Sequence, residues 1–360
     1  MEINFLEVYM EKMQWYINFI FFEVWCKAKG KDYVIEELFS GNEELCEIIT
    51  ELHYSQHKGA DFFLAGLQHI FEDFKILENT DIENLKHWYR SNNRVDLLCA
   101  KDPSVSPVTY NDIEKLSDKL SHHLKDFFKN LYSQSFLSLT SISSRIGQIE
   151  NHYTDFISKN ASGKCPFCGI NNVKGNYHSK REAYDHYLPK GKYPFNSINF
   201  RNLAPACNEC NSSYKLAQDP LYNAKDPLLP QTGGIRKSFY PYQVNQYTIE
   251  FKITLDSHDW NNIQPADIEL QTGPDELREE LDTWLDVYGI DERYKAKCCT
   301  KNDGKYWIEQ VLDECQNDGR TPEQIFNTLA RQAKLKPYAD VNFLKFPFLE
   351  ACNNKRLFDV

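Results

Sequence analysis

The stretch EAYDHYLPKGKYPFNSINFRNLAPACNECNSSYK, residues 182–215, gathers more potential ligands than any other part of the chain. It opens with an Asp-His pair, Asp185 and His186, and continues through Asn202 to a Cys-x-x-Cys turn that Asn211 follows directly. Pro and Gly interrupt it throughout, so we expect short strands and loops rather than long helices to position these side chains. The chemistry of this segment therefore decides the fold and the function that the sequence predicts.

Four cysteines form two Cys-x-x-Cys turns, one inside this stretch and one before it. The first turn is CPFC, with Cys165 and Cys168, and the second is CNEC, with Cys207 and Cys210. Each turn can present two thiolates to one tetrahedral Zn²⁺, and two turns complete a four-cysteine site. A redox dithiol would explain one pair but not two. Four thiolates leave no open coordination position, so we expect this zinc to stabilise the fold and not to catalyse.

Composition narrows the class of protein. The chain has 360 residues, of which 41% are hydrophobic, and this is enough for a real core and for two domains or one extended domain. The formal net charge of -11 argues against a generic nucleic-acid binder, so any such contact needs a local basic patch. Eleven cysteines without a secretory signal favour a reducing compartment, and we expect a cytoplasmic protein.

The N-terminal segment is unusually apolar and includes MQWYINFIFFEVW, residues 13–25. It lacks the basic region and the small-residue cleavage site of a signal peptide. Glu7, Glu11 and Glu23 interrupt it, so no uncharged run approaches the roughly 20 residues that a membrane span requires. We expect no membrane contact and interpret the segment as a helix that is either buried or part of an interface.

The pattern along the chain predicts an α+β protein in three parts: a helical region over 1–157, a compact metal-binding core over 158–235, and a mixed strand and helix region over 236–360. Apolar residues keep helical spacing over 111–136, with Thr109 or Asn111 as the N-cap. Farther along, YTIEFKITLD, residues 247–256, alternates as a strand does, and Gly289 is expected to end a helix that begins near Pro274.

The central segment resembles an HNH endonuclease of the ββα-metal class, in the subgroup that a four-cysteine zinc site braces. The order Asp-His, then Asn-Leu-x-Pro, then Cys-x-x-Cys-Asn-x-x-x-Lys matches that family over about residues 163–220. Two features depart from its pattern. Asn211 stands where the last histidine of the family name would be, and Lys215 lies one position later than the family's lysine often does.

The resemblance implies a role for each residue, and elementary chemistry agrees with it. His186 would be the general base, because imidazole titrates near neutral pH and can take a proton from water. Asp185 and Asn211 would hold a catalytic Mg²⁺ or Mn²⁺ through hard oxygen atoms. Asn202 would hydrogen-bond across the intervening loop. Neighbours on a strand face opposite ways, so we expect Asp185 and His186 to lie where a strand gives way to a loop.

Local charge favours contact with phosphate. Residues 161–220 contain eight Lys or Arg against four acids, a balance of +4, which leaves -15 on the other 300 residues. A basic island in an acidic protein is what phosphate binding needs, and we assign substrate binding to Lys190, Arg201 and Lys215. The alternative is that this charge only keeps a zinc-containing segment soluble.

These features together predict a metal-dependent endonuclease that cuts DNA. Bacterial nucleases of this resemblance often act beside a large ATPase in defence against phage, as in Septu-like systems. The chain has no Walker A motif of its own, so we expect control by a partner protein or a second copy docked on residues 1–60. The alternatives are a zinc-containing nucleic-acid-binding module without catalysis and a scaffold subunit.

Overall fold

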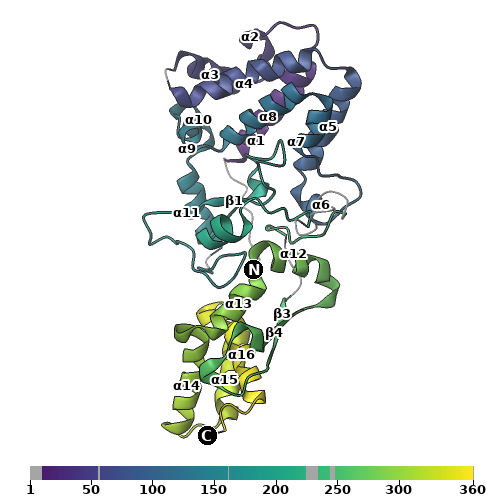
Figure 1. Ribbon diagram of the computed structural model, residues 1–360. Coiled ribbons are helices and arrows are strands. Elements are labelled where there is room, and N and C mark those ends of the chain that lie inside the picture. Colours follow the sequence, from purple (N-terminus) through teal and green to yellow (C-terminus); the bar gives the residue numbers. More distant parts are fainter. Residues whose placement is uncertain (1–9, 56, 161, 224–233, 244–247, 360) are drawn as a thin grey trace.

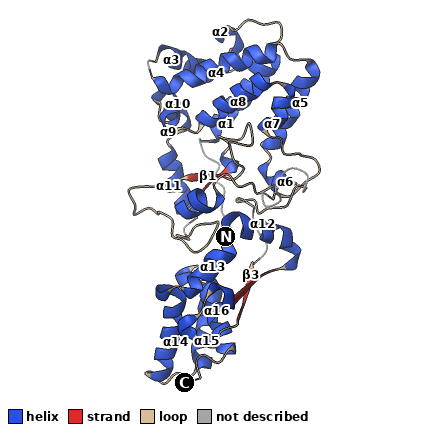
Figure 2. Cartoon of the chain, in the orientation of Figure 1, coloured by secondary structure: helices blue, strands red, loops and turns tan. Residues whose placement is uncertain are grey.

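The computed structural model describes residues 10–55, 57–160, 162–223, 234–243 and 248–359. A helical N-terminal region, a loop-rich middle that contains β1, and a C-terminal region follow one another along the long axis of the molecule (Figure 1). Helices dominate, and the strands described form two small antiparallel sheets of two strands each (Figure 2). The chain is therefore an α+β protein, as its sequence predicts.

The N-terminal region is built from helices that bury one apolar face each against a shared core. In order these are α1 (Glu11–Phe19), α2 (Ile35–Leu38), α3 (Glu43–Tyr54), α4 (Lys58–Lys75), α5 (Asn79–Asn92), α6 (Val95–Cys99), α7 (Tyr110–Leu116), α8 (Asp118–Leu131), α9 (Gln134–Leu137), α10 (Thr140–Ile146) and α11 (Ile149–Lys159). The last of these helices, α11, ends at Lys159.

The helical pattern over 111–136 is divided, which the apolar spacing alone did not predict. Thr109 is the N-cap of α7 and forms a capping box with Asp112. Ser117 then takes an extended conformation, with φ -160° and ψ 114°, and its side chain accepts from the Leu120 N–H at 3.2 Å. A serine in this conformation ends one helix and caps the next, so α7 and α8 are separate although their apolar residues keep helical spacing.

The apolar stretch over residues 13–25 packs into the core of its own region. Its buried members are Met13, Tyr16, Ile17, Ile20, Phe21, Val24 and Trp25. Phe21 stacks on Tyr89 with ring centroids 4.1 Å apart, and the Trp25 indole donates to the Leu67 carbonyl at 3.0 Å. Trp15, at 64% exposure, points outward. Packing within the N-terminal core thus accounts for most of the apolar residues on which the expected docking surface over residues 1–60 was based. Residues 1–9 lie outside the part of the chain that the structure describes.

The middle of the molecule is a short strand pair followed by a helical turn. Strand β1 (Tyr184–His186) pairs antiparallel with β2 (Leu203–Pro205), so that Asp185 faces Ala204 across the pair. The loop between the strands reaches the N-terminal helices, where the Asn92 side chain donates to the Pro194 carbonyl at 3.1 Å. A π-helical turn, Cys210–Lys215, follows β2. Because β1 is anchored on both sides, the loop holds its side chains in fixed positions.

The C-terminal region combines one hairpin with a group of helices. Its elements are β3 (Glu250–Leu255), β4 (Ile268–Gly273), α12 (Arg278–Tyr288), α13 (Ile290–Cys299), α14 (Tyr306–Gln316), α15 (Pro322–Leu335) and α16 (Asn342–Asn354). Gly289 ends α12 in the left-handed conformation, with φ 58°, as expected. A Cβ at Gly289 would lie 2.4 Å from the Tyr214 ring, so this end of α12 packs directly on the π-helical turn.

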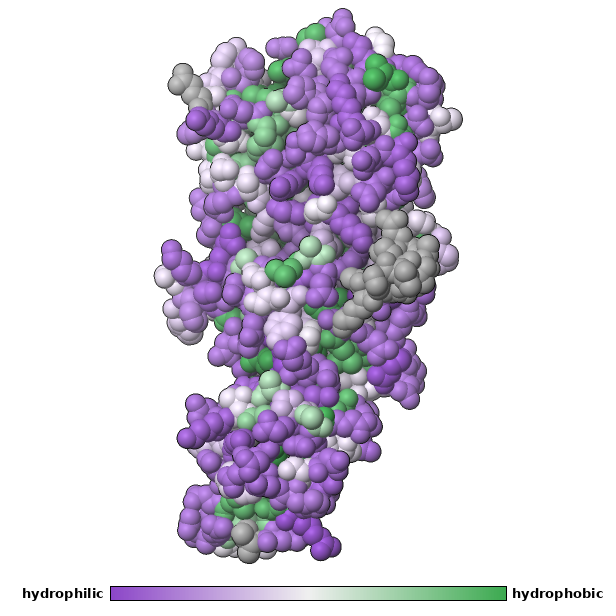
Figure 3. Space-filling view, viewed as in Figure 1, coloured by the Kyte–Doolittle hydropathy of each residue, from purple (hydrophilic) through white to green (hydrophobic). Residues whose placement is uncertain are grey.

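The length and apolar character of the helices bear on whether any of them could cross a membrane. Within the described residues, none of the helices combines the length and the apolar character that crossing a membrane would require. The face in Figure 3 is largely hydrophilic, with small and separate hydrophobic patches. Isolated patches of this kind are ordinary on folded proteins.

Candidate metal centre and the Asp185–His186 loop

The four cysteines of the two Cys-x-x-Cys turns come together. The Sγ atoms of Cys165, Cys168, Cys207 and Cys210 all lie within 4.8 Å of one another, and all four residues are buried. Across the two turns, Cys168 Sγ and Cys207 Sγ are 3.9 Å apart. Such a cluster could hold a metal ion, and a set of four soft thiolates is typical of zinc.

Hydrogen bonds to sulfur favour negative charge on one member of this cluster, Cys207. The backbone N–H groups of Cys207 and Cys210 point at Cys165 Sγ and Cys207 Sγ, each at 3.4 Å. The Asn171 side chain donates to Cys207 Sγ at 3.5 Å. Hydrogen bonds from the three neighbouring thiols also lower the pKa of Cys207. The thiolate form that a metal requires is therefore favoured at this residue.

A buried arginine from the C-terminal region lies against the cluster. Arg293 on α13 is 4% exposed, and its guanidinium donates to Cys210 Sγ at 3.2 Å and to Glu209 at 3.0 Å. Burial opposes its charge, but the negative charge on Cys210 and Cys168 raises the pKa of Arg293. Zn²⁺ with four thiolates carries a net charge of 2−, which this cation offsets in part. The sequence offers no signal for Arg293, because it lies 83 residues from Cys210.

Two aromatic side chains of the same region hold the first cysteine turn. The Trp284 indole donates to the Phe167 carbonyl at 2.6 Å, and the Tyr294 hydroxyl donates to the Cys168 carbonyl at 2.7 Å. The Phe167 ring stacks on Tyr288 with centroids 4.9 Å apart. Helices α12 and α13 are therefore part of the wall of the metal centre, although they come more than a hundred residues later in the chain.

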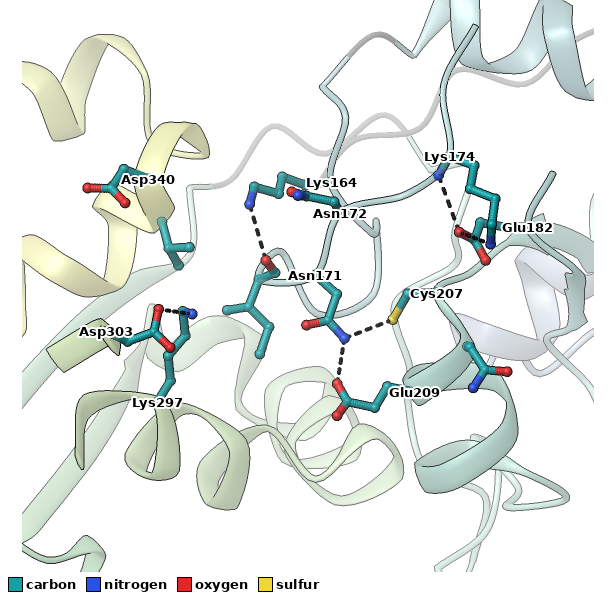
Figure 4. A pocket seen from close by; sticks show the side chains of 13 residues that line it. Lys164, Asn171, Asn172, Lys174, Glu182, Cys207, Glu209, Lys297, Asp303 and Asp340 are labelled. Carbon is teal, nitrogen blue, oxygen red and sulfur yellow. Dashed lines mark hydrogen bonds and ion pairs between the residues drawn. The ribbon is translucent and has the colours of Figure 1, made fainter. Parts of the chain in front are cut away.

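An open polar cavity of about 690 Å³ lies beside Cys207. Figure 4 shows that its charged groups are turned toward one another: Lys174 toward Glu182, and Lys297 toward Asp303. The Asn171 amide in the same view lies between Cys207 and Glu209. Two of the three lysines in its lining are paired with acids and the third, Lys164, donates to the Ile170 carbonyl, so the cavity does not present a cationic surface for phosphate.

Asp185 is buried on one side of β1 and is held by a lysine. The residue is 3% exposed, and its Oδ1 accepts from Lys215 Nζ at 3.0 Å. Its second oxygen, Oδ2, is buried without a hydrogen-bond partner. Burial raises the pKa of Asp185, although the Lys215 ammonium opposes this shift. One oxygen of a buried carboxylate is thus left for a further donor or cation.

His186 is the last residue of β1 and its ring turns to a different set of partners. Its Nε2 lies 3.0 Å from the Ser197 carbonyl oxygen, and its ring meets Tyr132 edge-on at 4.9 Å. A carbonyl only accepts, so Nε2 carries the proton and the neutral ring keeps a lone pair on Nδ1. Burial, together with the charges of Lys190 and Lys215, lowers the pKa of His186 to about 3. The ring is therefore neutral at neutral pH, but a pKa this low also makes it a weaker base in this arrangement than an exposed imidazole would be.

Asn202 braces the loop that carries the Ser197 carbonyl. Its side chain accepts from the Leu188 N–H at 2.8 Å and donates to the Leu188 carbonyl at 3.0 Å. The same amide reaches the Asn196 carbonyl at 3.4 Å. Asn202 is 1% exposed, so these bonds are shielded from water. One buried side chain thus links both ends of the loop.

Asn211 and Lys215 are arranged differently from the expectation. Among the described residues, no hydrogen bond joins the Asn211 side chain to Asp185. Its backbone carbonyl accepts from the Leu216 N–H at 3.2 Å, five residues on, in the π-helical turn. Lys215 was assigned to a phosphate contact but is fully buried on Asp185 and on the His186 carbonyl, at 2.8 Å. In this structure a carboxylate of the chain itself thus takes the place of the expected phosphate, and a phosphate contact would require the ammonium to leave Asp185.

The remaining basic residues of the segment are also largely engaged. Lys190 donates to the Lys129 carbonyl at 3.2 Å and lies over the Tyr132 ring, and Arg201 lies 3.4 Å from Glu11. Of the eight Lys and Arg over residues 161–220, five form ion pairs with acids: Lys174, Arg181, Lys192, Arg201 and Lys215. The local positive charge is thus mostly balanced within the chain.

Comparison with known proteins gives one partial match. No family model matches the chain, and no solved structure matches it. Protein ea31 of Escherichia phage lambda is 35% identical over 81 residues, which cover 21% of this chain and 25% of that protein. The chain thus spans about a quarter of the length of this relative, too little to show a family.

Proposed function

We propose that the chain is a metal-dependent endonuclease that hydrolyses phosphodiester bonds in DNA, with His186 as the general base. The observation that carries this proposal is the bond between His186 Nε2 and the Ser197 carbonyl. It fixes the ring tautomer and leaves Nδ1 to accept a proton from an attacking water. Asn202 holds the loop on which this carbonyl lies, so the base is oriented before substrate binds.

The donors around Asp185 are of the class that Mg²⁺ or Mn²⁺ takes. Asp185 Oδ2 is a buried hard oxygen without a partner, and Asn211, on the π-helical turn, offers a carboxamide oxygen. These two residues would hold the ion, which would stabilise negative charge on the phosphate and on the leaving oxygen. The zinc that the four cysteines would bind has a separate role, because it closes the loops around β1 and β2.

The order of elements supports the same reading. A strand that ends in Asp-His, a loop braced by an asparagine, a returning strand and a helical turn follow one another over residues 184–215. This order is similar to that of an HNH core with a four-cysteine brace. We extend the proposal to control by a partner, such as an ATPase, and to phage defence in the cytoplasm. Its support is the resemblance to Septu-like nucleases.

A plasmid assay tests the proposal. Zinc-loaded protein is incubated with supercoiled DNA and Mg²⁺ or Mn²⁺, and the nicked and linear products are quantified. We expect His186→Ala to lower the cleavage rate by at least ~100-fold, because the base is lost, while thermal stability and zinc content persist. The matched control is His258→Ala, an exposed histidine outside the loop, which should cleave as the wild type does.

Three outcomes of this assay would contradict parts of the proposal. Equal cleavage by His186→Ala and wild type would exclude His186 as the base. Cleavage that is unchanged by a chelator selective for Mg²⁺ and Mn²⁺ would exclude the catalytic metal. Vigorous cleavage by the isolated monomer would remove the need for a partner, since we expect only slow nicking by the chain alone.

A zinc-containing nucleic-acid-binding or scaffold subunit without catalysis is the second candidate. The observation in its favour is that Lys215 already neutralises Asp185 and that most basic residues of the segment are paired. The assay separates the two functions when a gel-shift measurement accompanies it. Binding of DNA without metal-dependent cleavage, in the wild type as in His186→Ala, would favour this second function.

A further inference from the structure

Lys215 has the surroundings of an internal counter-ion. It is 0% exposed, and lysine is almost never fully buried unless it is paired. Its ammonium donates to Asp185 Oδ1 at 3.0 Å and to the His186 carbonyl at 2.8 Å. Both acceptors belong to the end of β1, where the proposed base and metal ligand lie. In the described part of the chain, the cation that contacts this site is therefore a side chain of the protein itself.

Charge balance at Asp185 leaves little room for a second cation. One ammonium neutralises one carboxylate, and a divalent ion added to this pair would leave two uncompensated positive charges in a buried site. Asn211, the other expected ligand, has no hydrogen bond to Asp185 among the described residues. The ammonium on Asp185 Oδ1 therefore opposes binding of a divalent ion at this site, although Oδ2 has no partner.

The backbone around Lys215 has two features that are typical of segments that change conformation. Lys215 is the last residue of a π-helical turn, and such turns are rare and occur frequently at functional sites. The next residue, Leu216, has φ 48° although it is not glycine, and its side chain is 61% exposed. A strained backbone residue directly after a buried functional side chain is of the kind that occurs in segments with two arrangements.

We propose that Lys215 is the resident cation of the Asp185 site, which it keeps free of divalent metal until the ammonium is displaced. This inference rests on the proposed function and adds a control step to it. The phosphate of a bound nucleic acid supplies the alternative acceptor for the ammonium, so that substrate and metal enter together. The resting chain is then inactive because its metal ligand is already neutralised.

Thermal unfolding with and without Mn²⁺ tests this exchange without any need for cleavage. Lys215→Met keeps the length of the side chain and removes its charge, which leaves Asp185 buried without a cation. We expect the melting temperature of zinc-loaded Lys215→Met to fall by about 5 °C or more, and millimolar Mn²⁺ to restore most of that loss. The wild type should gain about 1 °C or less from the same Mn²⁺ concentration.

A double variant is the matched control. Asp185→Asn combined with Lys215→Met removes both charges, so it should be more stable than Lys215→Met in the absence of Mn²⁺ and should not respond to it. The Mn²⁺ that each protein binds is counted from the electron paramagnetic resonance signal of the free ion. Lys215→Met should bind one ion at least ~10-fold more tightly than the wild type does.

Each outcome decides the inference. Equal Mn²⁺ affinity of wild type and Lys215→Met, or no restoration of stability by Mn²⁺, would overturn it. If Lys215→Met is too unstable to purify, refolding from urea gives the answer: recovery only with Mn²⁺ supports the inference, and no recovery in either buffer overturns it. A rescued Lys215→Met whose wild type never cuts DNA would instead overturn the proposed function and leave this exchange intact.

Discussion

The two metal-type sites of this molecule, the four-cysteine cluster and the Asp185 site, differ in how complete they are. The cluster brings four thiols within 4.8 Å of one another and surrounds them with hydrogen-bond donors and Arg293. At the other site one carboxylate oxygen has no partner and a lysine holds the second. The ligands of the four-cysteine cluster all lie on two tight turns, so this site forms as the chain folds. The state of the Asp185 site depends instead on which cation, the Lys215 ammonium or a metal ion, neutralises the carboxylate.

The largest effect should come from breaking the cluster. Cys207→Ser removes one thiolate, so bound zinc should fall from one per chain toward zero and the melting temperature should fall by at least ~10 °C. Structural zinc contributes on the order of 10 kcal/mol to the folding of small metal-bound domains. Zinc content and thermal unfolding are measured together, with Cys315→Ser, a cysteine outside the cluster, as control. Well-folded protein without zinc in the wild type would disprove the metal centre.

An intermediate effect should come from the loop that holds His186. Asn202→Ala leaves the N–H and the carbonyl of Leu188 buried without their partners. We expect the free energy of unfolding to drop by about 2–4 kcal/mol, because each unsatisfied buried group costs about 1–3 kcal/mol. Urea unfolding measures this loss, and zinc content should stay at one per chain.

Asn208→Ala, an exposed asparagine between the last two cysteines of the cluster, is the matched control for Asn202→Ala. It should change the free energy of unfolding by less than ~0.5 kcal/mol. If Asn202→Ala loses zinc as readily as stability, the two sites are not independent and the contrast between them fails.

The same contrast between the two sites decides which features could be predicted from the sequence. The spacing of Cys165, Cys168, Cys207 and Cys210 was sufficient for the cluster, because each turn sets the separation of its own two sulfur atoms. The motif order placed His186 at a strand end and Asn202 on the loop, since these relations are local. The partner of Lys215 and the role of Arg293 depend on tertiary packing across 30 and 83 residues, for which the sequence has no periodic signal.

The smallest effect should be a loss of folding stability at acid pH that comes from a histidine packed beside β1. His152 of α11 lies against Tyr184 of β1, and burial lowers the pKa of His152 to about 4. An unfolded histidine titrates near 6.5, so the unfolded chain binds more protons below that pH and stability is lost as the pH falls from about 6.5 toward 4. One such histidine costs up to about 1.4 kcal/mol per pH unit in that range.

His152→Phe keeps an aromatic ring beside Tyr184 and Phe200 and removes this titration. We therefore expect the loss of unfolding free energy between pH 6.5 and 5.5 to shrink by about 1 kcal/mol in the variant, because His186 still titrates. Urea unfolding at both values, with zinc content checked at each, measures the difference. An identical pH dependence of variant and wild type would show that His152 is not held neutral by burial.

The contacts of α12 and α13 with the first cysteine turn bear on whether the central segment can be transferred to another protein. Trp284 and Tyr294 donate hydrogen bonds to carbonyls of this turn, and Arg293 donates to the Cys210 sulfur of the second turn, all from a distant part of the chain. A fragment cut out at the sequence boundaries of the motif would leave these donors behind, together with the stacked ring of Tyr288. The segment that carries the motif thus cannot be transferred to another protein by itself. Any exchange of this segment between relatives has to include α12 and α13.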